Sequence, residues 1–285
     1  MQKRNQEQII TLEKIKAFAL YLQEQEKSAA TISKYTHDLN ALRGSLPDGK
    51  LTKAALICWK EKLSTQYAAA SVNTMLAALN GFLDFCGWPG LKIKPLKVQR
   101  EIFCREEKEL TRAEYVRLVK SAEQEGNERL SLVIQTLCAT GIRVSELRYI
   151  TVDAVRSGRA EVNSKGKQRT VFLPEKLRSL LRKYLQKKKI TTGAVFVTRN
   201  GNPMDRSNIW REMKLLCESA GVAPEKVFPH NLRHLFARTY YGLEKDLSRL
   251  ADILGHSNVN TTRIYTIESG AVHEKQVARM GLVIT

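Results

Sequence analysis

Long apolar runs are absent from this sequence. No stretch reaches the roughly 18 consecutive apolar residues that a membrane-spanning helix needs. The first thirty residues also lack the apolar core that a secretory signal peptide contains. Both absences favour a cytoplasmic protein over a membrane or secreted one.

Paired cysteines are absent as well. The five cysteines are odd in number, lie far apart and form no C-x-x-C pair: Cys58, Cys86, Cys104, Cys138 and Cys217. Neither a disulfide framework nor a zinc cluster is therefore expected. Cys138 and Cys217 lie within apolar helical patterns, which predicts buried thiols.

Acidic residues are few compared with basic ones. The 285 residues include 47 lysines and arginines but only 29 aspartates and glutamates, which gives a net charge of +18. A charge of this size favours a polyanionic partner. A basic protein that is merely soluble would have the same composition, so the charge alone does not decide between them.

The length and the apolar periodicity indicate two domains. Four short helices with tight connections are predicted between residues 12 and 88, which suggests a small helical bundle over residues 1–90. The predicted helix starts are Ser28 or Thr31, Thr52 and Ser71.

An extended linker is predicted over residues 91–105, because prolines and a glycine near its start disfavour a helix. Its basic residues suit a path along an anionic partner, although a solvated tether would have the same composition. These residues are Lys92, Lys94, Lys97 and Arg100.

The second domain is predicted to occupy residues 106–285 and to be mainly α-helical with a small antiparallel β-sheet. Thr111 and Glu114 form a capping-box pattern at its first helix. Gly141 is a plausible stop for a strongly apolar helix. Arg143 would then begin the next helix, RVSELRYITVDAV, where a helix N-terminus favours an anion.

The segments RAEVNSK and RTVFLP are expected to form a hairpin whose KGKQ tip carries Lys165 and Lys167. A further strand with an Asn-Gly turn is predicted in AVFVTRNGNPM, followed by a helix capped by Ser207. Arg206 and Arg211, near the start of that helix, could bind an anionic partner or simply face water.

The stretch from Pro229 to Tyr265 contains the residue types that phosphate chemistry needs. His230, Arg233 and His234 recur at helical spacing, so one helix face presents all three. Imidazole and guanidinium groups hold anions and move protons, and a nearby phenol adds an oxygen nucleophile. This pattern predicts phosphate chemistry without a metal.

The chain resembles the tyrosine recombinase (phage integrase) family in its Xer-like form. The resemblance covers essentially the whole chain and rests on six residues in the family's order: Arg143, Lys165, His230, Arg233, His256 and Tyr265. It implies a two-domain, C-shaped clamp in which the helical first domain lies across double-stranded DNA from the catalytic domain. We expect no cofactor, a nucleoid-associated location, and a homotetramer on two paired DNA sites with tails exchanged between protomers.

The resemblance also implies a role for each residue. Arg143 and Arg233 would clamp the non-bridging oxygens of the scissile phosphate. His256 would donate a hydrogen bond to the same phosphate, and His230 would accept the proton of Tyr265. The phenol would attack and leave a 3′-phosphotyrosine and a free 5′-hydroxyl.

Lys165 would protonate the departing 5′-oxygen. The hairpin is one residue shorter than the family's usual form, which leaves Lys167 as a competing assignment. Glu146, one turn after Arg143, could orient Arg143 or His230, or form only an ion pair within its helix.

Other classes of protein compete with this interpretation. His230, His234 and His256 could form a metal-dependent nuclease site, but the sequence lacks the HExxH glutamate and places the cation Arg233 between two ligands. A DNA-binding protein with a decayed active site would not retain every expected catalytic side chain. A type IB topoisomerase shares the chemistry, but the tail after Tyr265 suggests a docking element for assembly.

The predicted function is therefore site-specific DNA cleavage and rejoining through a phosphotyrosine intermediate, for integration or excision of a mobile element. Xer-type resolution of chromosome dimers is the alternative biological role.

Overall fold

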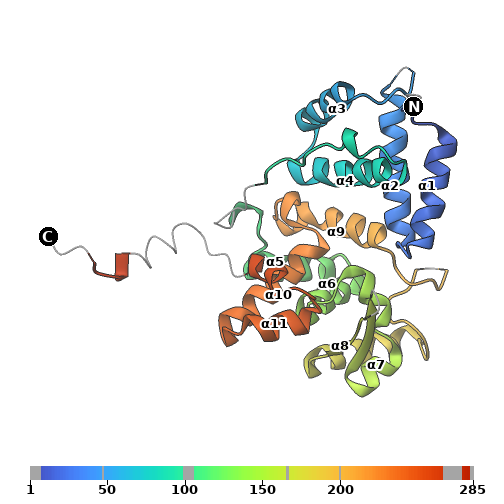
Figure 1. Cartoon of the computed structure of the whole chain (residues 1–285). Coiled ribbons are helices and arrows are strands. Elements are labelled where there is room, and N and C mark those ends of the chain that lie inside the picture. The colour runs from blue at the N-terminus through green and yellow to red at the C-terminus, as the bar shows by residue number, and fades with distance from the viewer. Residues whose placement is uncertain are drawn as a thin grey trace, which may run out of the picture. The chain divides into compact units, whose positions relative to one another are not determined.

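The chain divides into two compact units, Met1–Arg100 and Glu101–Thr285. The computed structural model describes residues 8–46, 48–98, 106–164, 167–198, 200–265 and 278–282. Helices make up most of both units (Figure 1). Within the described ranges, every helix is too short or too polar to cross a membrane.

The first unit is a bundle of four helices around an apolar core that includes Phe18, Leu42 and Phe82. Ser28 and Thr52 cap their helices by accepting a hydrogen bond from a backbone N–H in the first turn, as the sequence predicts. The elements are α1 (Leu12–Glu24), α2 (Ala29–Gly44), α3 (Lys53–Gln66), α4 (Ala69–Phe85) and the 3₁₀ turn η1 (Pro89–Leu91).

The start of α4 differs from the prediction. The helix begins at Ala69 rather than at Ser71, and its N-cap residue, Ala68, accepts no side-chain hydrogen bond. No local capping signal marks this start, so the serine two residues later was the wrong choice.

Residues 92–98 follow η1 as an irregular, non-helical stretch, and segment 91–98 packs along α4. Asn80 exchanges two hydrogen bonds of 2.9 Å with the backbone of Ile93. Asn73 does the same with Leu96, at 2.7 and 2.9 Å. Leu91 and Ile93 are buried, whereas Lys92, Lys94 and Lys97 are exposed. The non-helical conformation agrees with the prediction, and this segment belongs to the first unit.

The second unit has a large core, formed mainly by its helices and a two-stranded antiparallel hairpin, and a smaller apolar cluster of Ala237, Leu250, Leu254 and Tyr265. Its helices and strands are α5 (Arg112–Gln124), α6 (Glu128–Thr140), α7 (Val152–Ser157), β1 (Arg159–Ser164), β2 (Lys167–Phe172), α8 (Glu175–Lys188), α9 (Arg206–Ala220), α10 (Pro229–Glu244) and α11 (Leu247–Leu254). Its 3₁₀ turns are η2 (Glu106–Lys108), η3 (Val144–Tyr149), η4 (Pro224–Lys226), η5 (Val259–Thr261) and η6 (Arg263–Tyr265).

The second strand of the hairpin begins earlier than predicted, and the connection between the strands is shorter. β1 and β2 pair in register from Arg159 with Phe172 to Ser164 with Lys167. Lys167 therefore belongs to a strand, and only two residues separate the strands instead of the four of KGKQ. The pairing fixes the backbone of Lys167, which the sequence placed in a loose turn.

Three other predictions in this unit need correction. The helix expected after Arg143 is divided into η3 and α7 at Ile150 and Thr151, of which Thr151 is extended and caps α7. The strand expected in AVFVTRNGNPM forms only isolated bridges, among them Val197 with Pro203. Asp205, not Ser207, caps α9, because its carboxylate accepts the Asn208 N–H at 2.7 Å.

The end of α6 fixes the loop that leads to Arg143. Gly141 ends the helix with a φ of +64°, and an added Cβ would lie 2.4 Å from the Phe236 ring of α10. Both the left-handed backbone and the close approach require glycine here. α6 and α10 thus meet closely where the polar side chains of the unit gather.

Candidate active site

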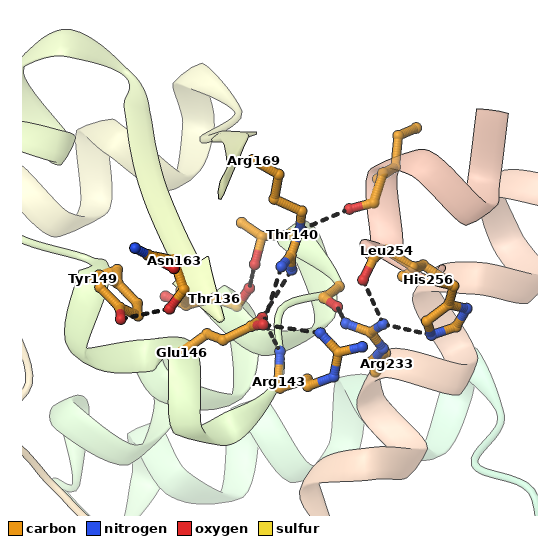
Figure 2. A network of polar contacts seen from close by, with 12 residues as sticks. Thr136, Thr140, Arg143, Glu146, Tyr149, Asn163, Arg169, Arg233, Leu254 and His256 are labelled. Carbon is orange, nitrogen blue, oxygen red and sulfur yellow. Dashed lines mark hydrogen bonds and ion pairs between the residues drawn. The ribbon is translucent and has the colours of Figure 1, made fainter. Parts of the chain in front are cut away.

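Several segments of the second unit bring one polar cluster together (Figure 2). Arg143 and Glu146 come from the start of η3, and Arg169 comes from β2. Arg233 lies on α10, and His256 follows α11. The cluster therefore joins segments that are more than a hundred residues apart in the sequence.

Glu146 is the centre of this cluster and is only 1% exposed. Arg143 donates to its carboxylate from the backbone N–H (2.8 Å) and from Nη1 (2.9 Å). Arg169 donates from Nη1 (3.0 Å) and Nη2 (2.8 Å) in a bidentate pair. Burial by itself would raise the pKa of Glu146, but the hydrogen bonds and charges of both arginines outweigh it and lower the pKa to about 2.

Arg169 is a site residue that sequence reasoning missed. Its Nε also donates to the Ile253 carbonyl at 3.2 Å, so it ties β2 both to Glu146 and to the end of α11. Gly255 makes room for it, because an added Cβ would lie 2.9 Å from the Arg169 Cδ. No local pattern distinguishes this arginine from the other basic residues of the hairpin.

Arg233 is buried, with 2% of its surface exposed. Its Nη1 donates to the Gly141 carbonyl (2.7 Å) and its Nη2 to the Leu254 carbonyl (2.8 Å). Burial and the charge of Arg143 lower its pKa. The side chain of Arg143, by contrast, is 38% exposed and therefore accessible to a ligand.

The cluster carries net positive charge. It contains three guanidinium groups, those of Arg143, Arg169 and Arg233, and one carboxylate, that of Glu146. Such an arrangement attracts an anion and can hold its oxygens with charged hydrogen bonds.

His256 has hydrogen-bond partners at both ring nitrogens. Its Nε2 faces Arg233 Nη2 at 2.9 Å, and its Nδ1 faces the Thr262 hydroxyl at 2.8 Å. Burial and the nearby arginine charges lower its pKa to about 4. The imidazole is therefore neutral at pH 7 and already satisfied on both sides.

Tyr265 is 3% exposed and packs among histidines. The His234 ring meets it edge to face at a centroid distance of 4.6 Å, and the His256 ring stacks on it at 6.0 Å. His230 lies one step farther away, 4.7 Å from His234. The predicted nucleophile thus lies beside the arginine cluster of its own chain.

His234 is the second residue that sequence reasoning left without a role. The helical spacing places it on the face of His230 and Arg233, but only the fold shows that it contacts Tyr265. Its Nδ1 lies 3.9 Å from a Glu109 oxygen. Burial raises the pKa of Glu109, but the neighbouring His234 and the hydrogen bond from Arg238 lower it to about 2 overall.

His230 is more exposed than the other site histidines. Desolvation and the positive charges of His234, Arg233 and Arg143 lower its pKa to about 4. The charge of Arg206, at the start of α9, acts in the same direction. Arg206 therefore lies near the site.

The remaining predicted residues are placed differently. Arg211 is exposed on α9, and the three lysines of segment 91–98 belong to the first unit. The backbone of Lys167 pairs with Ser164 in the hairpin. Lys165 and Arg100 lie outside the described residues.

The side-chain arrangement does not favour a metal centre. Both nitrogens of His256 are already bonded to Arg233 and Thr262. Within the described ranges, no three His, Cys, Asp or Glu side chains gather as a metal-binding group. The arrangement is suited to holding an anion between guanidinium groups, and it presents a phenol beside them.

The chain belongs to the phage integrase family and is a tyrosine recombinase, a DNA breaking and rejoining enzyme. The model described as the phage integrase family matches residues 108–270, and that of the phage integrase N-terminal SAM-like domain matches residues 15–90. The family resemblance and the mainly helical fold class predicted from the sequence are thereby confirmed.

Full-length relatives support this assignment. Tyrosine recombinase XerA of Pyrococcus furiosus is 27% identical, covering 97% of each chain. XerA of Thermococcus kodakarensis is 31% identical, covering 89% of this chain and 90% of its own. The solved lambda integrase tetramer bound to a Holliday junction has a similar fold, with a TM-score of 0.70, 19% identity, and coverage of 90% of this chain and 78% of that one.

Proposed function

We propose that this recombinase cleaves and rejoins double-stranded DNA at a specific site, with Tyr265 as the covalent nucleophile. The observation that carries the proposal is the position of Tyr265, beside His256 and near the buried guanidinium of Arg233. A phosphate held by these groups would lie within reach of the phenol. The net charge of +18 suits a duplex partner.

The two arginines act on the phosphate. Arg143 is held by Glu146 yet partly exposed, so that its free donors can bind a non-bridging oxygen. Arg233 is fixed by two backbone carbonyls before any ligand binds. Donors held in place in this way stabilise the charge that develops in the transition state without reorganising.

Histidines supply and remove protons. In this assignment, His256 donates to the phosphate after gaining a proton, and His230 accepts the proton of Tyr265. The His234 ring contacts both the His230 ring and the Tyr265 ring. His234 therefore supports the phenol from α10, the helix that also carries His230. Low pKa values keep both assigned histidines neutral in the free protein.

Lys165 protonates the 5′-oxygen as it departs. The ester to Tyr265 conserves the energy of the broken phosphodiester, so rejoining needs neither ATP nor a metal. The hairpin register favours Lys165 over Lys167 as the acid, because Lys167 belongs to β2, where its backbone pairs with Ser164.

The test of this function is a denaturation-resistant DNA adduct. Tyr265→Phe should abolish the adduct and leave DNA binding nearly unchanged. Tyr241→Phe is the matched control, since Tyr241 packs against the same small cluster. Cleavage by the wild type should persist in excess chelator. An adduct that survives Tyr265→Phe, or complete loss of cleavage on chelation, would overturn the assignment.

We also propose a homotetramer on two paired DNA sites, in which residues 267–285 dock on a neighbouring protomer. Recombination pairs two duplexes, and the lambda integrase relative is a tetramer on a Holliday junction. Truncation after Ile267 should weaken assembly on paired sites more than binding to one site. Unchanged tetramers in sedimentation would contradict this proposal.

For the biological role, we propose integration and excision of a mobile element. The match to the phage integrase family supports this choice. Sequencing the DNA on both sides of the Tyr265 adduct tests it, because junctions at the ends of an element are expected. A single junction in the chromosome's replication-terminus region would instead indicate chromosome-dimer resolution.

A further inference from the structure

Thr262 lies between η5 and η6 and is completely buried. Its hydroxyl contacts His256 Nδ1 at 2.8 Å, and its carbonyl accepts the Tyr265 N–H at 3.0 Å. A single residue is therefore bonded both to the proposed phosphate donor and to the proposed nucleophile.

The direction of each hydrogen bond can be assigned from the partners. A guanidinium only donates, so His256 Nε2 must present a lone pair to Arg233 Nη2. In a neutral imidazole the other nitrogen then carries the proton. His256 Nδ1–H therefore donates, and the Thr262 hydroxyl accepts.

This arrangement must change when DNA binds. To donate to a phosphate oxygen, His256 Nε2 has to gain a proton, which it can take from solvent to form an imidazolium. The Nδ1–H bond to Thr262 is the same before and after that step. The charged and titratable groups around the ring are Arg143, Arg169, His230, Arg233 and Tyr265.

We propose that Thr262 is a positioning residue of the active site. Its hydroxyl accepts the Nδ1 proton of neutral His256, holds the orientation of the ring and directs Nε2 towards the scissile phosphate. Its carbonyl fixes the turn that carries Tyr265. The expected effect of Thr262 on the cleavage rate rests on the proposed function. The protonation and hydrogen bonding of His256 in the free protein do not depend on that function.

The first test uses the free protein with ¹⁵N-labelled histidine. Wild type and Thr262→Ser should show one neutral tautomer of His256, protonated on Nδ1. Thr262→Val removes the acceptor at similar volume. Arg233 still holds Nε2 unprotonated, so the tautomer should persist, but the Nδ1–H should lose its hydrogen-bonded chemical shift and exchange faster with solvent. Thr261→Val, at the exposed neighbouring position, is the control and should resemble wild type. An unchanged His256 spectrum in Thr262→Val would overturn the proposal.

The second test measures the rate of adduct formation across pH 5–9. An alcohol bonded to an imidazolium is a charge-assisted contact, so Thr262→Val should slow cleavage about 10- to 100-fold and shift the pH profile, with Thr262→Ser close to wild type. If Thr262→Val does not fold, Thr262→Ala replaces it in both tests. Failure of Tyr265 as nucleophile would appear separately, as an adduct that persists in Tyr265→Phe.

A uniform loss of activity with the wild-type pH profile and the wild-type Nδ1–H signal would indicate only a packing role for Thr262, and would refute the proposal.

Discussion

Glu146→Gln should strongly destabilise the second unit. The carboxylate is 1% exposed and accepts four hydrogen bonds from two arginines. An amide can accept from only one side and turns its NH₂ group towards donors, which leaves the charge of Arg169 largely buried without a carboxylate to neutralise it. Breaking a buried pair in this way costs about 3–5 kcal/mol in the free energy of unfolding.

The measurement is urea unfolding followed by the fluorescence of Trp210, which reports the second unit. Trp59→Phe and Trp88→Phe remove the signal of the first unit. Arg169→Met added to Glu146→Gln should recover part of the loss, because it removes the unpaired charge. A double variant as unstable as the sum of its single variants would show that the two residues are not coupled.

The pH dependence gives an independent check. Glu146 has a pKa of about 2 in the folded protein, against about 4.3 in an unfolded chain. Its contribution is therefore fully present above pH 4.3 and is lost as the pH falls towards 2, by about 3 kcal/mol in total. Wild type should lose more stability than Glu146→Gln over this range. Parallel curves for the two proteins would refute the reasoning.

Three further predictions concern DNA. The Lys165→Ala variant should cleave normal DNA ~10²–10⁴-fold more slowly than wild type, and its cleavage rate should be largely restored when sulfur replaces the 5′ bridging oxygen. Restoration in Lys167→Ala instead would identify Lys167 as the general acid. Neutralising the lysines at 92, 94 and 97 should reduce the salt slope of binding by about 0.9 per lost phosphate contact, and an unchanged slope would place them in solvent. A bound phosphate should raise the pKa of His256 from about 4, so the affinity for DNA should increase as the pH falls from 7 to 5, by up to about tenfold per pH unit. Calorimetry in two buffers should show that His256→Gln lacks the proton uptake that accompanies DNA binding by wild type.

Local signals explain which parts of the fold the sequence predicts. Ser28, Thr52 and the Thr111–Glu114 capping box satisfy backbone donors within one turn, so the sequence alone identifies them. Gly141 ends its helix for an equally local reason, its positive φ. The strand predicted around Val197 failed because its apolar residues are buried without a neighbouring strand to pair with.

The sequence predicted only some residues of the candidate site. The family's order of residues brought Arg143, Arg233, His256 and Tyr265 to attention, and the structure places them in one cluster. Arg169 was missed because its partner, Glu146, is 23 residues away and only the fold brings them together. Thr262 was missed for the same reason, and His234 was placed on the correct helix face but without its contact to Tyr265, since both contacts depend on how the segment ending in η6 packs on its neighbours.

The docking of residues 91–98 on α4 determines where the chain can be truncated without removing contacts of the first unit. A fragment ending at residue 90 would remove Leu91 and Ile93 from the core and leave Asn73 and Asn80 without their backbone partners. A fragment ending at residue 98 keeps these contacts. The longer fragment should therefore be the one that folds on its own, and proteases should spare the stretch between residues 90 and 98.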